Sequence, residues 1–203
     1  ASLRPGAWVA AIGNPHEMVR TISVGVVSAT GRRGARLEGT PQYADFIQTD
    51  ADLNPGSSGG PLVDGLGRVV GLSTAVMARA QGIAFATPID QVETVVESLR
   101  TRGRFVRGFA GFTVRPVRIG AAAEASLQRV YGALVQSVVP EGPAERAGLK
   151  GGDIVLKFGA TKVEDSTLLP WLVAASPPGA VVEVRYARGT QRGVALLTLS
   201  EAP

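Results

Sequence analysis

The sequence predicts a mainly β protein in which an all-β domain is followed by a small α+β domain. Short apolar or β-branched runs are separated by loops rich in Gly and Pro, and the 203 residues include 26 Gly and 13 Pro without a fixed period. No convincing helical period occurs between residues 8 and 88, whereas the second half mixes strands with short helices. With 45% hydrophobic residues, the chain can bury a substantial core.

The first domain begins with five short apolar or β-branched runs, which predict strands. The runs are WVAAIG at 8–13, TISVGVVSAT at 21–30, DFIQTDA at 45–51, RVVGLSTAV at 68–76 and GIAFATP at 82–88. Several strands without a helix between them favour a barrel or a sandwich.

The spacing of apolar residues changes to a helical period after residue 90 and predicts one helix over residues 91–102. This helix is the last element of the first domain, which spans residues 1–103. Val92, Val95, Val96 and Leu99 follow helical spacing. Asp90 and Glu93 predict a capping box, and Gly103 suits the C-terminal end.

For the second domain, 104–203, the sequence predicts several strands and two helices. Strands are expected at 105–114, 131–139 and 151–158, with a hairpin at 181–199. GPAERAGL at 142–149 predicts a short helix. TLLPWLVAAS predicts another helix, begun by Asp165 or Ser166, because Pro170 falls near the first turn, where a missing N–H does least harm.

Composition argues against several classes of function. The net charge of +4 comes from scattered basic residues, which argues against nucleic-acid binding. The absence of Cys excludes disulfides and thiol chemistry, and a single histidine, His16, argues against a metal site, so no metal or cofactor is expected. No apolar run reaches the roughly 20 residues of a membrane-spanning helix. Without an initiator Met or a signal peptide, the chain is expected to be a piece of a longer protein.

The stretch NPGSSGGPL at 54–62 allows two interpretations. Gly, Pro and Ser are ordinary turn residues, so it can be a plain turn. Two adjacent serines among glycines, directly after a strand, also suit a nucleophile held outside a tight turn whose backbone N–H groups face an oxyanion.

Five motifs in order decide between these interpretations. They are AIGNP at 11–15, SVGVVSATGR at 23–32, FIQTDADLNPGSSGGPLV at 46–63, RVVGLSTA at 68–75 and GIAFATP at 82–88. In this order they resemble the C-terminal β-barrel of trypsin-like serine proteases of the HtrA/DegP branch. RGFAGF at 107–112, GALVQSVVPEGPAERAGLKGGDIV at 132–155 and SPPG at 176–179 resemble the PDZ domain of the same family. The resemblance implies one antiparallel barrel of a trypsin-like protease domain followed by a PDZ domain.

The resemblance implies roles for the serine stretch. Ser58 is the expected nucleophile, and the N–H groups of Gly56, Ser57 and Ser58 are the expected oxyanion hole, although Ser57 stands where the family usually has Asn. In the family, the general-base His and its Asp lie in a preceding barrel. His16 occupies a loop position where the family commonly has an aromatic residue, so it is expected to be a surface or loop histidine. We therefore expect this chain alone to be inactive.

Three further features of the first domain have implied roles. Ser73, Thr74 and Ala75, in the run 73–85 that lines the substrate channel, are expected to pair with the substrate backbone. The loop 31–45 either carries signals between the two domains or is a plain surface loop. Asp52 stands six residues before Ser58, where trypsin-like enzymes have the base of the specificity pocket. It either selects basic substrate residues, or points to solvent or pairs with an Arg.

In the second domain, the resemblance implies a peptide-binding groove. Phe109, Ala110, Gly111 and Phe112 match the loop whose N–H groups capture a C-terminal carboxylate, although the family usually has a larger apolar residue in place of Ala110. Leu169, with Leu172 and Val173, is a candidate for the other wall, and core packing would explain each of these residues equally well.

The resemblance thus implies an ATP-independent serine endopeptidase of the bacterial cell envelope that acts on unfolded or misfolded proteins. Its PDZ domain is expected to bind peptide C-termini or apolar segments. The longer parent protein is expected to be a trimer, with the trimer contacts largely in the barrel that precedes this chain's barrel in the family. The alternative is a binding module, either a pseudoprotease or a processed fragment, whose working part is the PDZ domain.

Overall fold

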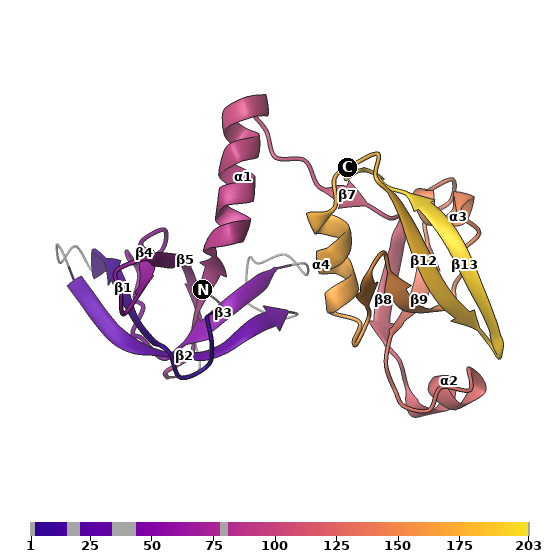
Figure 1. Cartoon of the computed structure of the whole chain (residues 1–203), viewed down its shortest axis with the longest axis horizontal. Helices are drawn as coiled ribbons and strands as arrows, with labels where there is room; N and C mark the ends of the chain where they lie inside the picture. The colour runs from indigo at the N-terminus through magenta and orange to yellow at the C-terminus, as the bar shows by residue number, and fades with distance from the viewer. Residues whose placement is uncertain (1–2, 16–20, 34–43, 78–80, 203) are drawn as a thin grey trace. The chain divides into compact units, whose positions relative to one another are not determined.

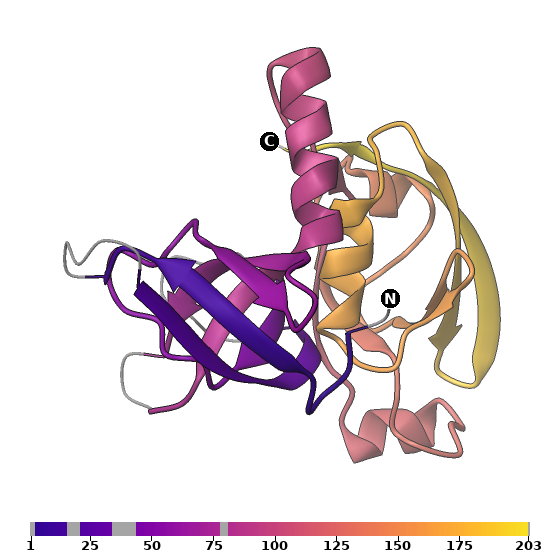
Figure 2. The ribbon, with the colours of Figure 1, turned by 60° about the vertical axis from the view of Figure 1, so that its left-hand side comes forward.

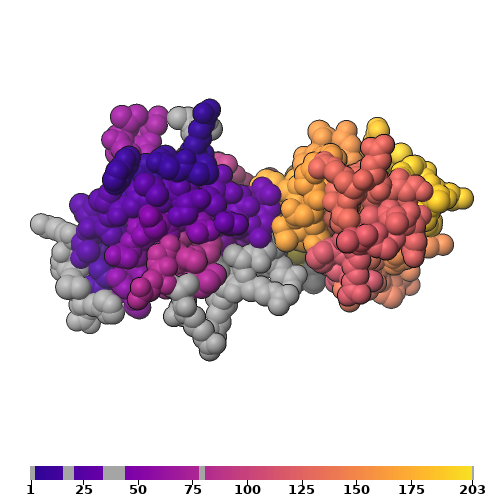
Figure 3. Space-filling model, turned by 90° about the horizontal axis from the view of Figure 1, so that it is seen from below, coloured from indigo at the N-terminus to yellow at the C-terminus, as the bar shows by residue number. Residues whose placement is uncertain are grey.

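The computed structural model describes residues 3–15, 21–33, 44–77 and 81–202, and Figure 1 draws the remaining residues in grey. The chain divides into two compact units, Ala1–Phe105 (unit 1) and Val106–Pro203 (unit 2). Each unit is described by itself. Figure 3 shows the surface of both units in the colours of Figure 1.

Unit 1 is a closed antiparallel barrel with the strand order β1-β2-β3-β6-β5-β4 (Figures 1 and 2). Its strands are β1 (Trp8–Gly13), β2 (Thr21–Arg33), β3 (Asp45–Thr49), β4 (Pro61–Asp64), β5 (Val69–Val76) and β6 (Ala84–Pro88). Closure leaves no free sheet edge, so the backbone N–H and C=O groups of the strands can form hydrogen bonds within the barrel. The predicted barrel is confirmed.

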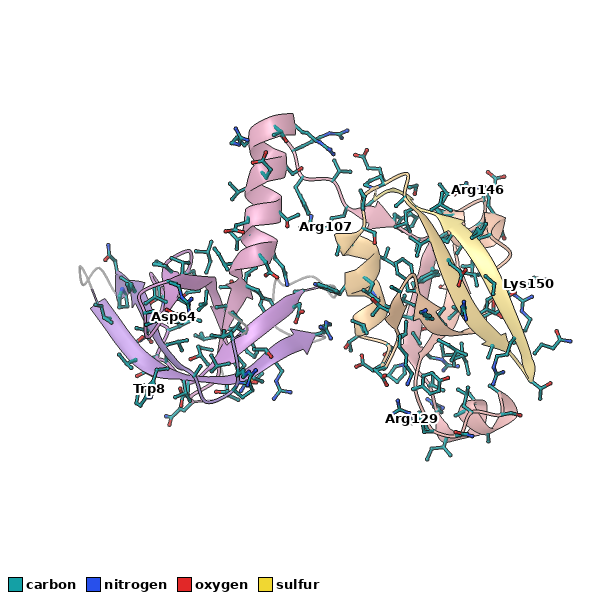
Figure 4. The ribbon with its side chains drawn as sticks, viewed as in Figure 1. Trp8, Asp64, Arg107, Arg129, Arg146 and Lys150 are labelled. Atoms are coloured by element: carbon teal, nitrogen blue, oxygen red, sulfur yellow. The ribbon has the colours of Figure 1, made fainter. Side chains whose placement is uncertain are left out.

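Side chains that point into the barrel alternate along the strands with side chains that point outward, and the inward ones form the core. On β1, Val9 and Ala11 are buried, whereas Trp8 is 67% exposed and points outward (Figure 4). β2 carries β-bulges opposite β3, which bend the strand as barrel closure requires. The core consists of small and medium apolar residues: Val9, Ala11, Val27, Ile47, Ala51, Leu53, Leu62, Ala84 and Ala86.

Helix α1 (Ile89–Arg102) follows β6 and contacts β5 and β6. It ends as predicted at Gly103, which has φ 69° and donates its N–H to the Leu99 carbonyl. The predicted capping box is wrong, because the N-cap is Pro88 and no side chain caps it. The carboxylate of Asp90 instead accepts the N–H of Gln91.

Unit 2 is built on an antiparallel sheet with the order β13-β12-β10-β9-β8, and β11 pairs with β10. The strands are β8 (Phe112–Pro116), β9 (Ala133–Val138), β10 (Ile154–Phe158), β11 (Thr161–Lys162), β12 (Val181–Arg188) and β13 (Gln191–Thr198). β7 (Gly108–Phe109) pairs separately with β14 (Ser200–Glu201). The helices are α2 (Ile119–Glu124), α3 (Pro143–Arg146) and α4 (Leu168–Ala175).

Two apolar clusters fill unit 2. The larger cluster joins α3 and α4 to the sheet: Ala110, Ala133, Val135, Ala144, Leu149, Val155, Phe158, Val163, Leu169, Val173, Val184, Ala195, Leu197 and Leu199. The smaller cluster joins α2 to residues of β9, β10 and β12: Val117, Ala122, Ala125, Leu134, Ile154 and Ala187. The sheet is therefore covered on both faces, as expected of an α+β domain. No helix in the described part of the chain is long and apolar enough to cross a membrane.

Candidate functional site

Residues 54–60, called the serine turn below, form the second part of the connection between β3, which ends at Thr49, and β4. The N–H of Ser57 donates to the Asn54 carbonyl at 2.8 Å, and the N–H of Gly60 donates to the Ser57 carbonyl at 3.0 Å. Two more bonds fasten the turn to β5: Gly59 N–H to the Ser73 carbonyl at 2.7 Å, and Ser73 N–H to the Gly60 carbonyl at 2.9 Å. The turn is thus held from within and from the neighbouring strand.

Two positions in the serine turn require glycine. Gly56 has φ 100°, a conformation that other residues rarely adopt, and a Cβ there would overlap the carbonyl oxygen of Asn14. A Cβ on Gly60 would overlap the carbonyl oxygen of Ile12. Glycine therefore lets the turn pack directly against the end of β1.

The two adjacent serines lie in different environments. Ser58 is exposed, and its Oγ donates to the Thr74 carbonyl at 3.4 Å. Ser57 is only 5% exposed, and its Oγ accepts the N–H of Asn54 at 3.4 Å. Of the two serines, Ser58 is therefore the exposed one. His16 lies outside the described residues.

The backbone donors of the turn differ in availability. Within the described part of the chain, the N–H groups of Gly56 and Ser58 donate to no acceptor, whereas that of Ser57 is used by Asn54. Unpaired N–H groups in the same turn as an exposed hydroxyl can stabilise an oxyanion. Of the three N–H groups predicted for the oxyanion hole, two are therefore open in this conformation.

Asp52 is exposed and lies beside the serine turn. It lines a concavity of about 350 Å³ together with Asn54, Ser57 and residues 21–24 of β2. Its backbone carbonyl accepts the Ser23 hydroxyl at 2.5 Å. Its carboxylate forms no ion pair with any residue that the structure describes. This exposure favours the interpretation that the carboxylate points to solvent.

The residues predicted to pair with substrate divide into two groups. Both backbone groups of Ser73 are used by the serine turn, and its side chain is 2% exposed. Thr74 and Ala75 lie beyond it at a β-bulge, where Ala75 pairs with Phe85 of β6 and the Thr74 carbonyl accepts the Ser58 hydroxyl. Substrate pairing by these two residues stays a prediction. In the predicted channel-lining run 73–85, residues 78–80 lie outside the described part.

The loop at 31–45 is described only at its two ends, because residues 34–43 lie outside the described part. At those ends, Arg33 pairs with Asp45 across the last rung of β2 and β3 at 3.3 Å. Burial raises the pKa of Asp45, and the neighbouring Arg33 opposes this shift. A partly buried ion pair thus joins the end of β2 to the start of β3.

In unit 2, residues 109–112 form a turn with open backbone donors. The carbonyls of Ala110 and Gly111 accept the N–H groups of Ala144 and Val139, at 2.9 and 2.8 Å. The N–H groups of Ala110 and Gly111 have no acceptor among the described residues. Gly111 has φ 75°, which a turn of this kind requires. Two adjacent donors can hold a carboxylate.

On α4, the three candidate residues for the predicted groove differ in burial. Leu169 has no exposed surface and belongs to the core, so it cannot touch a docked peptide in this conformation. Leu172 is partly exposed and packs against the same cluster as Phe112 and Val114 of β8. Val114 was not predicted, although its alternation with Thr113 gives the signal. Phe112, Val114 and Leu172 are thus the partly buried apolar residues near this turn that pack against the core cluster.

The described residues contain no group of three or more His, Cys, Asp or Glu side chains that could hold a metal ion.

Comparison with known proteins gives matches for both units. Residues 1–72 match the family model of the trypsin-like peptidase domain, and residues 108–198 match that of the PDZ domain. The chain is 37% identical over 204 aligned residues to the "Probable periplasmic serine endoprotease DegP-like" of Marinomonas sp. strain MWYL1, covering 99% of this chain and 43% of that protein.

Solved structures are similar over the whole chain. The HtrA-type protease AlgW with a tripeptide is 35% identical with a TM-score of 0.86, covering 100% of this chain and 67% of that one. The serine endoprotease from Yersinia pestis is 32% identical with a TM-score of 0.69, covering 100% of this chain and 65% of that one. The chain thus spans less than half the length of the Marinomonas relative and about two thirds of these solved chains.

Proposed function

Since this chain belongs to the HtrA/DegP-like family of trypsin-fold serine proteases with a PDZ domain, we propose that it is the nucleophile-bearing part of an ATP-independent serine endopeptidase. Ser58 is the nucleophile, and the N–H groups of Gly56 and Ser58 hold the oxyanion. The observation that supports this proposal best is the exposed Ser58 in a turn where two backbone N–H groups have no acceptor in the described structure.

In the proposed reaction, the Ser58 Oγ attacks the scissile carbonyl carbon and loses its proton to a histidine base. The carbonyl oxygen becomes an oxyanion that the two N–H groups stabilise, and collapse of this intermediate releases the amine and leaves an acyl-enzyme. Water then hydrolyses the ester. The histidine and the aspartate that orients it belong, in this proposal, to a preceding barrel of a longer protease.

We further infer that the longer protease acts on unfolded or misfolded proteins in the bacterial cell envelope. Relatives named as periplasmic proteases support the compartment. An AlgW structure solved with a peptide supports peptide binding by the family. The expected trimer of the longer protein belongs to the same proposal.

The test is degradation of an unfolded, casein-like protein by the longer protease without ATP. We expect cleavage of the unfolded substrate and little cleavage of a stably folded one. Equal resistance of both substrates would contradict the proposed function.

The 203-residue chain alone should show no measurable proteolysis. Its sequence holds one histidine, His16, whose place in the AIGNP loop does not match that of the family's base, so Ser58 has no partner to take its proton. The measurement is turnover of the same unfolded substrate by the isolated chain. Turnover that disappears in Ser58→Ala would overturn this expectation.

Unit 2 also supports a second function, that of a binding module, because the open N–H groups of Ala110 and Gly111 directly precede the edge strand β8 with its apolar residues Phe112 and Val114. We expect the chain to bind peptides that end in an apolar residue and a free carboxylate, with a Kd of roughly micromolar size. Amidation of the peptide C-terminus should weaken binding by at least about tenfold, because it removes a charged acceptor. Fluorescence anisotropy measures both peptides, and equal affinities would exclude carboxylate capture.

Substitution of Asp52 should leave the cleavage preference of the longer protease unchanged. Its carboxylate is exposed, so it can remain hydrated without selecting a basic substrate residue. Cleavage-site profiling of the parent and of Asp52→Ala is expected to give the same preference, without selection of Lys or Arg. A preference for Lys or Arg that is lost in Asp52→Ala would instead place Asp52 at the base of the specificity pocket.

A further inference from the structure

The edge strand of unit 2 offers one side of its backbone to a partner. β8 is the last strand in the sheet order and pairs only with β9. Figure 1 shows β8 at this side of the sheet, with the chain leaving it toward α2. An extended peptide can therefore add to β8 as a further strand.

The position of the open N–H groups fixes the direction of such a peptide. Ala110 and Gly111 directly precede β8, so a carboxylate held there places the peptide C-terminus at the start of the strand. The upstream peptide residues then run along β8 toward Pro116, antiparallel to it. Both strands advance about 3.4 Å per residue, so their positions stay in step.

Alternation then assigns neighbours to each peptide side chain. The last residue and the third from the end share the face of Phe112 and Val114, which pack against the core cluster. The second and fourth residues from the end share the other face, which carries the exposed side chains of Thr113 and Arg115. The last peptide residue lies beside Phe112. Arg115 is three positions after Phe112, and the fourth residue from the end is three positions before the last, so these two residues lie beside each other.

Two exposed arginines lie within β8 and just after it. Arg115 and Arg118 are exposed, and neither guanidinium group forms a hydrogen bond or ion pair with the residues that the structure describes. Arg129, which Figure 4 shows near α2, is by contrast paired with Glu164. Asp165, just before α4, is used by the N–H groups of Thr167 and Leu168. A positive charge therefore remains available beside β8.

We propose that Arg115 is a specificity-determining residue that selects Asp or Glu at the fourth position from the C-terminus of the bound peptide. Arg118, at the N-cap of α2, extends this preference to acidic residues further upstream. The preferred partner is thus a protein whose chain ends in an acidic segment followed by an apolar last residue. The inference rests on the proposed function of unit 2 in binding C-termini along β8.

The test compares two ten-residue peptides that end in Val and differ only by Glu or Gln at the fourth residue from the end. With the full chain, fluorescence anisotropy at low salt should give an affinity about three- to fivefold higher for the Glu peptide, the size expected of an exposed ion pair. Arg115→Gln should equalise the two peptides, and Arg115→Glu should favour the Gln peptide. High salt should reduce the difference.

Arg185→Gln is the matched control, because it removes the same charge from β12, three strands away from β8 in the sheet. It should keep the preference for the Glu peptide. If both peptides bind equally and an amidated peptide does not bind, the inference about Arg115 fails while the proposed function stands. If no peptide binds, or if Arg185→Gln and Arg115→Gln have the same effect, the inference is likewise overturned, and absence of all binding also refutes the proposed function of unit 2.

Discussion

Ser58→Ala should lower kcat of the longer protease by at least about 10⁴-fold, because it removes the atom that forms the acyl-enzyme. The fold should remain intact, since the Ser58 hydroxyl is exposed and makes a single 3.4 Å hydrogen bond, to the Thr74 carbonyl. The measurement is turnover of an unfolded substrate, with circular dichroism as the check on folding. Activity within tenfold of the parent would exclude Ser58 as the nucleophile.

Ser57→Ala provides the comparison within the same turn. Alanine keeps the backbone N–H of residue 57 and removes only a hydroxyl that accepts one long hydrogen bond from Asn54. We therefore expect a loss of at most about tenfold. A loss at Ser57 as large as that at Ser58 would show that activity depends on the structure of the turn rather than on one nucleophile.

The sequence was sufficient to predict the barrel, the α1 helix and the serine turn. The strands and their Gly- and Pro-rich loops follow from local residue preferences. The five ordered motifs led to the prediction that Ser58 is the nucleophile. The helix start was predicted less well. The predicted capping box did not form, because Pro88 rather than a polar side chain precedes the helix.

Roles that depend on strand register or helix phase were harder to predict. The backbone of Ser73 is used by Gly59 and Gly60 rather than open to a substrate, and this follows only from how β5 meets the serine turn. Similarly, Leu169 is buried and Leu172 is partly exposed, because the tertiary contacts of α4 decide which side of the helix enters the core.

The helix α2 was not predicted at all. Its sequence, IGAAAE, has a high helix propensity, but it is only six residues long and lacks an amphipathic period. Packing of Ala122 and Ala125 against Leu134 and Ile154 holds the segment in place. Such contacts join residues far apart in the sequence, so local patterns do not reveal them.

The buried carboxylate of Asp153 is another feature that the sequence did not reveal. It has no exposed surface, and its oxygens accept the Nε and Nη2 of Arg188, at 2.7 and 2.8 Å, and the N–H of Lys150 at 2.8 Å. Arg188 also donates to the Gly148 carbonyl at 2.8 Å. Hydrogen bonding to Asp153 raises the pKa of Arg188. One guanidinium thus ties β12 to the loop before β10.

Arg188→Ala should lower the free energy of unfolding of unit 2 by about 3 kcal/mol, because it leaves the Asp153 carboxylate buried without a counter-charge. The arginine side chain is itself 39% exposed, which places the expected loss at the lower end of the range for buried pairs. Urea unfolding followed by Trp171 fluorescence in a Trp8→Phe background measures this loss. The control, Arg185→Ala, removes an exposed partner of Glu183 and should cost at most about 0.5 kcal/mol. Equal losses in the two variants would show that the Asp153 pair contributes no more than a surface pair.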